Sequence, residues 1–379
     1  MVDVEKFTQR LDPDGSTFFA GVPDSLLKSF CSCLSATVDP SRRITAANEG
    51  AAMGLAAGHW LATGRPAVVF MQNSGIGNAV NPLLSLVDDE VYRMPVLLII
   101  GWRGEPGVHD EPQHVKQGKL TIPLLECMGI AHTILPDDTE GALAAVDAAR
   151  DYMMRELRPY ALVVRKGTFS DYAGPKAPAA EAPALELGRE QAIGLMLDKL
   201  PADAVVVSTT GMISRELFEL REKRGEGHAR DFLTVGSMGH ASQIAMAIAL
   251  AQPQRPVYCF DGDGASIMHL GSLAIIGQAA PRNFVHIVFN NGAHDSVGGQ
   301  PTAGFQIDLP AIAKACGYRS ALSVDTLAEA EALDLTKVAE EAPALVEVKV
   351  RKGARKDLGR PTTTPVENKE ALMAFLAGK

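Results

Sequence analysis

The chain of 379 residues is 46% hydrophobic and 21% charged, which is typical of a globular protein with room for two cores. With 35 Gly and 23 Pro, it has too little of either for a collagen-like or low-complexity chain. The formal net charge is −9, and no run of Lys or Arg is long enough to follow a phosphate backbone. We therefore expect no nucleic-acid partner.

Cysteine usage and hydropathy indicate a cytoplasmic protein with no membrane partner. The five Cys residues are an odd number in a long chain, which argues against a disulfide framework. Residues 1–7 lack the basic and apolar regions of a signal peptide. The most apolar stretch, residues 96–100, is far too short to span a bilayer.

In the first half of the chain, short β-branched runs alternate with longer helical patterns. This alternation predicts a mainly parallel sheet flanked by helices, an α/β fold. The predicted strands are residues 17–20, 43–45, 67–71, 96–100, 133–135 and 162–165. The predicted helices are residues 24–34, 49–61 and 139–156, in which apolar residues recur every three or four positions.

An Ala/Pro-rich stretch then interrupts the pattern and indicates a domain boundary. We predict a first domain at residues 1–172, a linker at 173–186 and a second α/β domain at 187–379. The strands expected in the second domain are residues 204–208, 232–235, 257–260, 284–289 and 345–350. The expected helices include residues 212–221 and 241–251, and a polar tail ends in a short helix at 371–376.

The strongest chemical signal is an acidic turn that precedes an Asn pair. Asp263 follows the predicted strand 257–260, and Asn290 and Asn291 follow the predicted strand 284–289. Because the carboxyl ends of parallel strands meet at one edge of a sheet, we expect these side chains to lie close together. Carboxylate and amide oxygens are hard ligands that suit Mg²⁺ beside a diphosphate. The alternative is a tight Asp-Gly turn next to a surface Asn pair.

The residues around Asp263 suit a bound anion. Gly262 and Gly264 let the backbone approach a ligand closely, and a helix expected to begin near Ser266 directs N–H groups to the same place. Gly-Asp-Gly separated by 25 residues from an Asn pair resembles the signature of thiamin-diphosphate-dependent enzymes. The resemblance implies two thiamin-diphosphate-binding-type domains that bind the cofactor and Mg²⁺. It also implies diphosphate contacts at Gly262, Gly264, Ala265 and Ser266, and metal ligands Asp263, Asn291 (rather than Asn290) and the Ala293 carbonyl.

Glu49 follows the predicted strand 43–45 and opens the predicted helix 49–61. The same resemblance implies that Glu49 is the catalytic carboxylate that faces the cofactor's pyrimidine ring. The alternative is that it only interacts favourably with the helix dipole.

Three further segments fit the resemblance as cofactor contacts. Met238 takes the place of the large apolar residue beneath the bent cofactor. The loop after the predicted strand 67–71 is the expected pyrimidine neighbour, and it lacks the last Gly of a dinucleotide fingerprint. The residues implied are Ser74, Gly75 and Asn78 in this loop, Thr209, Thr210 and Gly211 at the diphosphate, and Gly236 and Ser237 beside Met238.

Residues 21–28, 104–114 and 290–302, together with the short linker, are similar to the phosphonopyruvate decarboxylase family. The resemblance implies decarboxylation of 3-phosphonopyruvate to phosphonoacetaldehyde and CO₂ through a thiamin diphosphate ylid and an enamine. Alternatives are sulfopyruvate decarboxylase or another thiamin-dependent 2-oxo acid decarboxylase. Further alternatives are a nicotinamide oxidoreductase and a non-catalytic cofactor-binding subunit.

Several polar residues in these segments are candidates to bind or protonate a phosphonate 2-oxo acid. Lys28 and Arg103 offer positive charge, and His has an ordinary pKa near neutrality. The alternative for each is that it is only a solvated residue or part of a surface ion pair. The neutral donors expected at the substrate are Ser25, Gln113, Gln300 and Thr302, and the candidate proton carriers are Asp24, His109, His114, His294 and Asp295.

The resemblance also implies an assembly. One active site would need Glu49 from one subunit and Asp263 from another, so we expect a homodimer or a higher even homo-oligomer with active sites between subunits.

Overall fold

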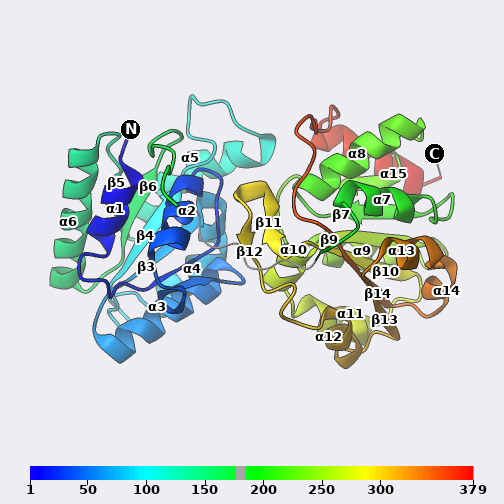
Figure 1. Ribbon diagram of the computed structural model, residues 1–379, viewed down its shortest axis with the longest axis horizontal. Helices are drawn as coiled ribbons and strands as arrows, with labels where there is room; N and C mark the ends of the chain where they lie inside the picture. The colour runs from blue at the N-terminus through cyan, green and yellow to red at the C-terminus, as the bar shows by residue number, and fades with distance from the viewer. Residues whose placement is uncertain (176–183, 379) are drawn as a thin grey trace. The chain divides into compact units, whose positions relative to one another are not determined.

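The computed structural model describes residues 1–175 and 184–378. The chain divides into two compact units, Met1–Glu181 and Ala182–Lys379. Most of the linker predicted at 173–186 falls on residues 176–183, which lie outside the described residues. Each unit is an α/β domain, which is the predicted fold class (Figure 1).

The first unit is built on a six-stranded sheet. Its strands are β1 (Phe19–Gly21), β2 (Arg43–Thr45), β3 (Ala67–Gln72), β4 (Val96–Gly101), β5 (Ala131–Ile134) and β6 (Tyr160–Val164). Its helices are α1 (Val4–Leu11), α2 (Lys28–Thr37), η1 (Pro40–Arg42), α3 (Glu49–Thr63), η2 (Asn73–Gly75), α4 (Ile76–Ser85), α5 (Pro112–Cys127) and α6 (Thr139–Glu156).

Helices cover both faces of this sheet. α1, α2 and α6 supply the apolar side chains on one face, and α3, α4 and α5 supply those on the other. β3 is a continuous apolar run because both of its faces are buried. Val68 and Phe70 belong to the first layer, while Val69 and Met71 belong to the second.

The strand order places a ligand-binding edge in the first unit. All strands are parallel in the order β2-β1-β3-β4-β6-β5. The chain runs outward from β1 to β2 and then returns to the other side of β1 as β3. Ligands of open α/β sheets bind where the strand order reverses, which here is at the carboxyl ends of β1 and β3.

The second unit repeats this plan with a second six-stranded sheet and a small hairpin. Its strands are β7 (Val205–Ser208), β8 (Asp231–Leu233), β9 (Val257–Gly262), β10 (Phe284–Asn290), β11 (Ala293–His294), β12 (Gln300–Pro301), β13 (Ser320–Val324) and β14 (Ala344–Lys349). Its helices are α7 (Arg189–Leu197), α8 (Met212–Arg224), α9 (Ala241–Ala251), α10 (Asp263–Met268), α11 (Ser272–Ala279), η3 (Asp295–Val297), α12 (Leu309–Ala315), α13 (Leu327–Ala332), α14 (Leu335–Glu340) and α15 (Pro365–Leu376).

The second sheet is parallel in the order β13-β14-β10-β9-β7-β8. α7, α8, α13 and α14 cover one face, and α9, α11, α12 and α15 cover the other. The strand order reverses between β7 and β9, so their carboxyl ends form the ligand-binding edge. The antiparallel hairpin β11–β12 follows β10 near this edge.

The C-terminal helix α15 is longer than predicted because strong start signals precede its apolar residues. Thr364 and Glu367 form a capping box, and Pro365 occupies the first turn. Asn368 then accepts a hydrogen bond from Leu233 N (3.0 Å) and donates one to Asp231 O (2.9 Å) on the edge strand β8.

Two local predictions are wrong, and one helix was not predicted. The helix expected at 24–34 begins only at Lys28, because Asp24 accepts Leu26 N in a tight turn (3.0 Å). The helix expected near Ser266 already begins at Asp263. The helix α5, whose start is marked only by Pro112, was not predicted, and Gln113 and His114 lie in its first turn. Among the described residues, no helix combines the length and apolar character needed to cross a bilayer.

Candidate active site

In the first unit, Glu49 lies against the segment that follows β3. Asn48 caps α3 by accepting Ala51 N, so Glu49 begins the helix, and its side chain is buried. Asn78 donates a hydrogen bond to Glu49 Oε2 at 2.7 Å. An added Cβ at Gly75 would lie 2.3 Å from Glu49 Oε1, so only Gly leaves room for this carboxylate. The structure thus brings three of the predicted residues together.

A second group joins the ends of β1 and β3. Gln72, which the sequence analysis missed, donates to Asp24 Oδ1 at 2.6 Å and accepts from Ser74 Oγ at 2.7 Å. Burial raises the pKa of Asp24, and the hydrogen bond from Gln72 opposes that rise. Gly101 at the end of β4 leaves the space that Asp24 occupies, since a Cβ there would lie 2.2 Å from Asp24 Oδ2.

Arg103 is largely engaged by protein groups. Its Nε donates to Asp110 Oδ2 at 2.7 Å, a second nitrogen contacts Asp110 Oδ1, and Nη1 donates to Ser25 Oγ at 2.8 Å. Although burial works against ionisation, hydrogen bonds from Arg103 and Gly104 N lower the pKa of Asp110 to about 2. Arg103 is therefore already neutralised by a carboxylate that the sequence analysis did not consider.

The remaining predicted residues of the first unit differ in exposure. His114 is buried, and burial, reinforced by the charge of Arg103, lowers its pKa to about 4. Its Nδ1 and the neighbouring Gln113 Oε1 are buried without a hydrogen-bond partner. His109 and Lys28 are exposed.

In the second unit, Asp263 and Asn291 are in contact at the ends of the adjacent parallel strands β9 and β10. Asn291 N lies 3.4 Å from Asp263 Oδ1, and both residues are buried. Burial raises the pKa of Asp263 to about 6, although hydrogen bonds from Thr302 and Asn291 N oppose this. A nearby cation would favour the ionised form.

The two Asn residues have different surroundings. Asn290 donates to Glu347 Oε1 (2.7 Å) and Gly304 O (2.8 Å), and its Oδ1 accepts Gly292 N (3.0 Å). Asn291 Oδ1 accepts a hydrogen bond from Ala293 N at 3.0 Å. An amide oxygen has two lone pairs, so Asn291 Oδ1 retains one for a cation.

The hairpin β11–β12 carries three more predicted residues. His294 packs on Gly264, where an added Cβ would lie 3.0 Å from His294 Cε1, and burial lowers the pKa of His294 to about 4. Gln300 Oε1 is buried without a hydrogen-bond partner. Thr302, predicted to bind substrate, donates its hydroxyl to Asp263 Oδ2.

Asp295 is part of a buried ionic network that the sequence analysis missed. It pairs with Arg189 at 3.0 Å, and Arg189 in turn pairs with Glu216 at 2.8 Å. Arg189 and Glu216 lie on α7 and α8, too far from Asp295 in the sequence for spacing to connect them.

The segments expected to contact the diphosphate and to lie beneath the bent cofactor follow β7 and β8. Thr209 directly follows β7 and has a buried hydroxyl without a partner, and Gly211 has φ +103°, which favours glycine. Thr210 lies between them, partly exposed. Between β8 and α9, Ser237 adopts φ +52°, next to a partly exposed Met238.

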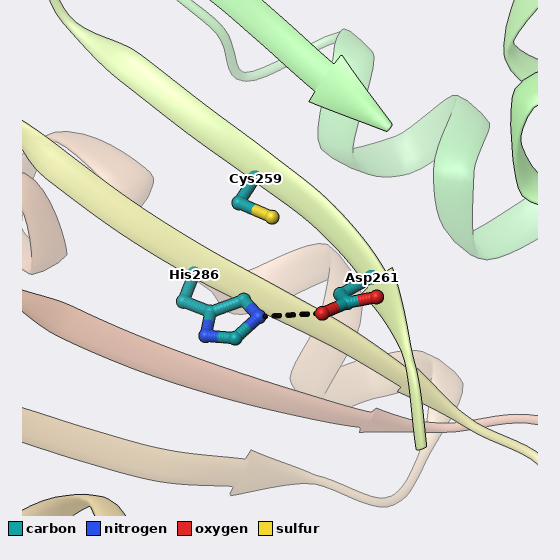
Figure 2. A group of neighbouring side chains, drawn as sticks. All are labelled: Cys259, Asp261 and His286. Atoms are coloured by element: carbon teal, nitrogen blue, oxygen red, sulfur yellow. Dashed lines mark hydrogen bonds and ion pairs between the residues drawn. The ribbon is translucent and has the colours of Figure 1, made fainter. Parts of the chain in front are cut away.

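A buried polar cluster lies behind the Gly-Asp-Gly turn. Cys259 and Asp261 on β9 and His286 on β10 point toward one another within 4.8 Å (Figure 2). His286 Nε2 pairs with Asp261 Oδ2 at 3.2 Å, and its Nδ1 with Tyr318 OH at 3.4 Å. Since both ring nitrogens already have partners, the cluster needs no metal ion to satisfy it. Asp261 also accepts Gly262 N and Ser266 Oγ, so it holds the turn that carries Asp263.

The residues present fit a bound diphosphate and Mg²⁺. Asp263 and Asn291 provide hard oxygen donors, and burial raises the pKa of Asp263 to about 6. Buried polar atoms without partners are costly. Four of them belong to predicted site residues, at Gln113, His114, Thr209 and Gln300, where a polar ligand can satisfy them.

Comparisons with known proteins identify the family. The family model described as "Thiamine pyrophosphate enzyme, N-terminal TPP binding domain" matches residues 4–122, and its C-terminal counterpart matches residues 209–348. Thiamine pyrophosphate is thiamin diphosphate. A phosphonopyruvate decarboxylase from Streptomyces viridochromogenes is 39% identical, covering 96% of this chain and 92% of the relative. The chain belongs to the phosphonopyruvate decarboxylase family of thiamine pyrophosphate enzymes.

Other relatives agree with this family assignment. A phosphonopyruvate decarboxylase from Streptomyces hygroscopicus is 37% identical over 93% of this chain and 88% of its own. A sulfopyruvate decarboxylase from Methanosarcina acetivorans is 28% identical over 85% of this chain and 84% of its own. Membership confirms the predicted fold class, enzyme class and organic cofactor. It also excludes the nicotinamide alternative, whereas the roles of individual residues stay predictions.

Proposed function

We propose that this chain converts 3-phosphonopyruvate to phosphonoacetaldehyde and CO₂ with thiamin diphosphate and Mg²⁺. The observation that supports this substrate is the 39% identity to a phosphonopyruvate decarboxylase, 92% of which is covered by the match. The contact between Asp263 and Asn291, at the carboxyl ends of β9 and β10 next to the switch point between β7 and β9, supports the metal.

The second unit is proposed to hold the cofactor's charged end. Asp263, Asn291 Oδ1 and the Ala293 carbonyl bind Mg²⁺, which neutralises diphosphate oxygens. The orphaned hydroxyl of Thr209 and the backbone beside Gly211 suit direct contacts to the diphosphate. The other proposed contacts are Thr210, Gly236, Ser237, Met238, Gly262, Gly264, Ala265 and Ser266.

Glu49 is proposed to exchange a proton with the cofactor's pyrimidine ring through Oε1. This oxygen faces Gly75, while Asn78 holds Oε2 in place. When bound, thiamin diphosphate supplies an electron sink for the electron pair that remains as CO₂ leaves. The protein residues then position the substrate and carry protons.

Lys28 is the proposed cation for the phosphonate. Arg103 already forms two contacts to Asp110, whereas Lys28 is exposed at the start of α2, three residues after Ser25. Gln113 and Gln300 are the proposed neutral donors to the phosphonate, through their amide nitrogens. Thr302 is proposed to act through Asp263, to which it donates.

His294 is the proposed proton carrier near the metal. Its lowered pKa keeps it neutral at pH 7, so it is ready to accept a proton, and a bound dianion close to it would raise that pKa. His114 and Asp24 are buried titratable groups in the first unit that are proposed to serve the substrate there. The exposed His109 has the weakest support of the set.

An even homo-oligomer with active sites between subunits belongs to the proposal. A groove along α3 is lined by the exposed Ile44 and Leu55 and by Gly54 and Gly58, and we propose that a second copy of the chain covers it. A cytoplasmic location is proposed as well, because all five Cys residues are free thiols.

A CO₂-release assay tests the substrate. The purified protein is incubated with Mg²⁺, thiamin diphosphate and one of phosphonopyruvate, sulfopyruvate or pyruvate. We expect kcat/KM to be highest for phosphonopyruvate. Preference for sulfopyruvate, which the relative from Methanosarcina acetivorans is named for, would replace the proposal with its nearest alternative.

A further inference from the structure

Three hydrogen-bond donors from separate parts of the second unit meet at one carboxylate oxygen of Asp295. Asp295 Oδ2 accepts hydrogen bonds from Arg189 Nη1 (3.0 Å), Asn291 Nδ2 (3.0 Å) and Gly353 N (2.8 Å). An oxygen that accepts three donors is poorly placed to take up a proton from substrate. These contacts connect Asp295 to the proposed metal ligand Asn291.

A second carboxylate, that of Glu216, also binds Arg189 and holds it in place. Arg189 Nε and Nη2 donate to the two oxygens of Glu216 at 2.8 and 2.9 Å. Arg189 is 4% exposed and Glu216 1% exposed, so both charges are removed from water and depend on this pairing. A planar guanidinium can bind Glu216 with one edge and Asp295 with another nitrogen, which a Lys ammonium cannot reproduce.

The network decides which way the Asn291 amide faces. An Asn side chain can turn over and exchange its oxygen and nitrogen with almost no change in shape. Asp295 Oδ2 accepts a hydrogen bond from Asn291 Nδ2, which selects the orientation in which Asn291 presents its amide nitrogen to Asp295. Asn291 Oδ1 must then face the other way, where Ala293 N donates to it at 3.0 Å.

We propose that Glu216, Arg189 and Asp295 form an orienting chain that keeps Asn291 Oδ1 available to Mg²⁺. All three are positioning residues for the metal site. The proposal rests on the proposed function, because it presumes that Asn291 is a metal ligand. Outer partners of this kind are typically worth 10- to 100-fold in metal affinity.

A second buried ion pair in the same unit provides a matched control. Arg221 on α8 donates from Nε and Nη2 to Asp231 at 3.0 Å each, and Arg221 is 2% exposed. It resembles Arg189 in burial and in its two-pronged pairing. The residues that Arg221 pairs with, Asp231 and Glu226, are not among the proposed site residues.

The test measures Mg²⁺ binding by calorimetry at saturating thiamin diphosphate without substrate, together with thermal unfolding. We expect Asp295→Asn to raise the Mg²⁺ dissociation constant about 10- to 100-fold. Arg189→Lys should raise it less, by about 3- to 10-fold, since it acts one contact further away. Arg221→Lys should lower the unfolding temperature while leaving Mg²⁺ affinity within about twofold of the wild type.

An exchange of side chains supplies the rescue. The double variant combines Asn291→Asp with Asp295→Asn. The amide introduced at position 295 donates to the carboxylate introduced at position 291. Whichever way that carboxylate turns, its second oxygen faces the metal. We expect this variant to recover most of the affinity lost in Asp295→Asn. It also carries the test if Asp295→Asn alone does not fold.

Each contrary result has a distinct meaning. Unchanged Mg²⁺ affinity in Asp295→Asn, with only kcat reduced, would restore the proton-carrier role and overturn the orienting chain. Equal weakening by Arg221→Lys would overturn it too, because the effect would then be one of general stability. If the wild-type protein binds no Mg²⁺ with thiamin diphosphate, the proposed function itself fails.

Discussion

Glu49 is the residue on which the proposed proton exchange depends. Glu49→Gln keeps the shape and the contact with Asn78 but removes the ionisable oxygen that faces Gly75. We expect CO₂ release to fall at least about 100-fold, as is typical for loss of a general acid–base group. Thiamin diphosphate and Mg²⁺ binding should stay within about threefold of the wild type by calorimetry. Undiminished turnover would remove Glu49 from the mechanism.

Asp263 should make Mg²⁺ binding depend on pH. Burial raises its pKa to about 6, so below pH 6 a proton competes with the metal. The apparent Mg²⁺ affinity should therefore fall about tenfold for each pH unit below 6 and be constant above pH 7. Calorimetry in buffers of different ionisation enthalpy measures the proton released. A flat profile down to pH 5 would contradict the assignment.

Lys28 should control substrate preference. If its ammonium meets the phosphonate, Lys28→Ala should raise the KM for phosphonopyruvate about 10- to 100-fold, the range for losing a charge-assisted contact, with little change in kcat. The KM for pyruvate, which lacks the phosphonate, should not change. A steady-state comparison of the two substrates separates this role from that of a surface charge.

At the scale of elements, the segment after β3 shapes the position of Glu49. Gly75→Ala would place a Cβ 2.3 Å from Glu49 Oε1, so the carboxylate must move. We expect a loss of kcat of at least about tenfold, since small misplacements of catalytic groups are costly. Gly77→Ala is the control, because no atom outside its own α4 helix lies within 4 Å of a Cβ there. Equal loss in both variants would mean that α4 itself is disturbed.

Element patterns in the sequence predicted the central strands of both sheets well because buried parallel strands leave a strong apolar signal, whereas the edge strand β13 was not predicted. β3, β4, β9 and β10 were each predicted to within two residues of their observed bounds. α2 and α5 were missed or misplaced, since their starts depend on the Asp24 turn and on a single Pro rather than on periodicity. The predicted contact between residues was therefore confirmed where the ends of adjacent strands determine the positions of those residues.

For the site, motif spacing indicated Asp263 and Asn291 but not the residues that hold them. Arg189 and Glu216 lie on helices without a motif, and only tertiary packing brings them to Asp295. Gln72 is similar, since its role follows from its contact with the buried Asp24. Such supporting side chains carry no sequence signal when a single chain is read alone.

For the whole molecule, His114 should make folding stability depend on pH. Its pKa falls from 6.5 in the unfolded chain to about 4 in the folded protein, so the unfolded state binds more protons between these values. Stability is therefore lost as pH falls from 6.5 to 4, by at most about 3 kcal/mol. Asp263, with a raised pKa, acts in the opposite direction between pH 4 and 6.

The comparison of wild type with His114→Gln isolates this contribution. Chemical denaturation at several pH values should give a difference between the two proteins that is constant above pH 7 and changes by at most about 3 kcal/mol towards pH 4. A constant difference over the whole range would show that His114 titrates normally in the folded protein.

The amide of Asn368 gives the last helix a role beyond packing. By pairing with both Leu233 N and Asp231 O, it occupies backbone groups of the outermost strand β8 that would otherwise be open to another polypeptide. Shortened forms of the chain that end before α15 would therefore expose the backbone hydrogen-bonding groups of the edge strand β8. Self-association of such fragments would result from this uncovered edge and not from a defect in catalysis.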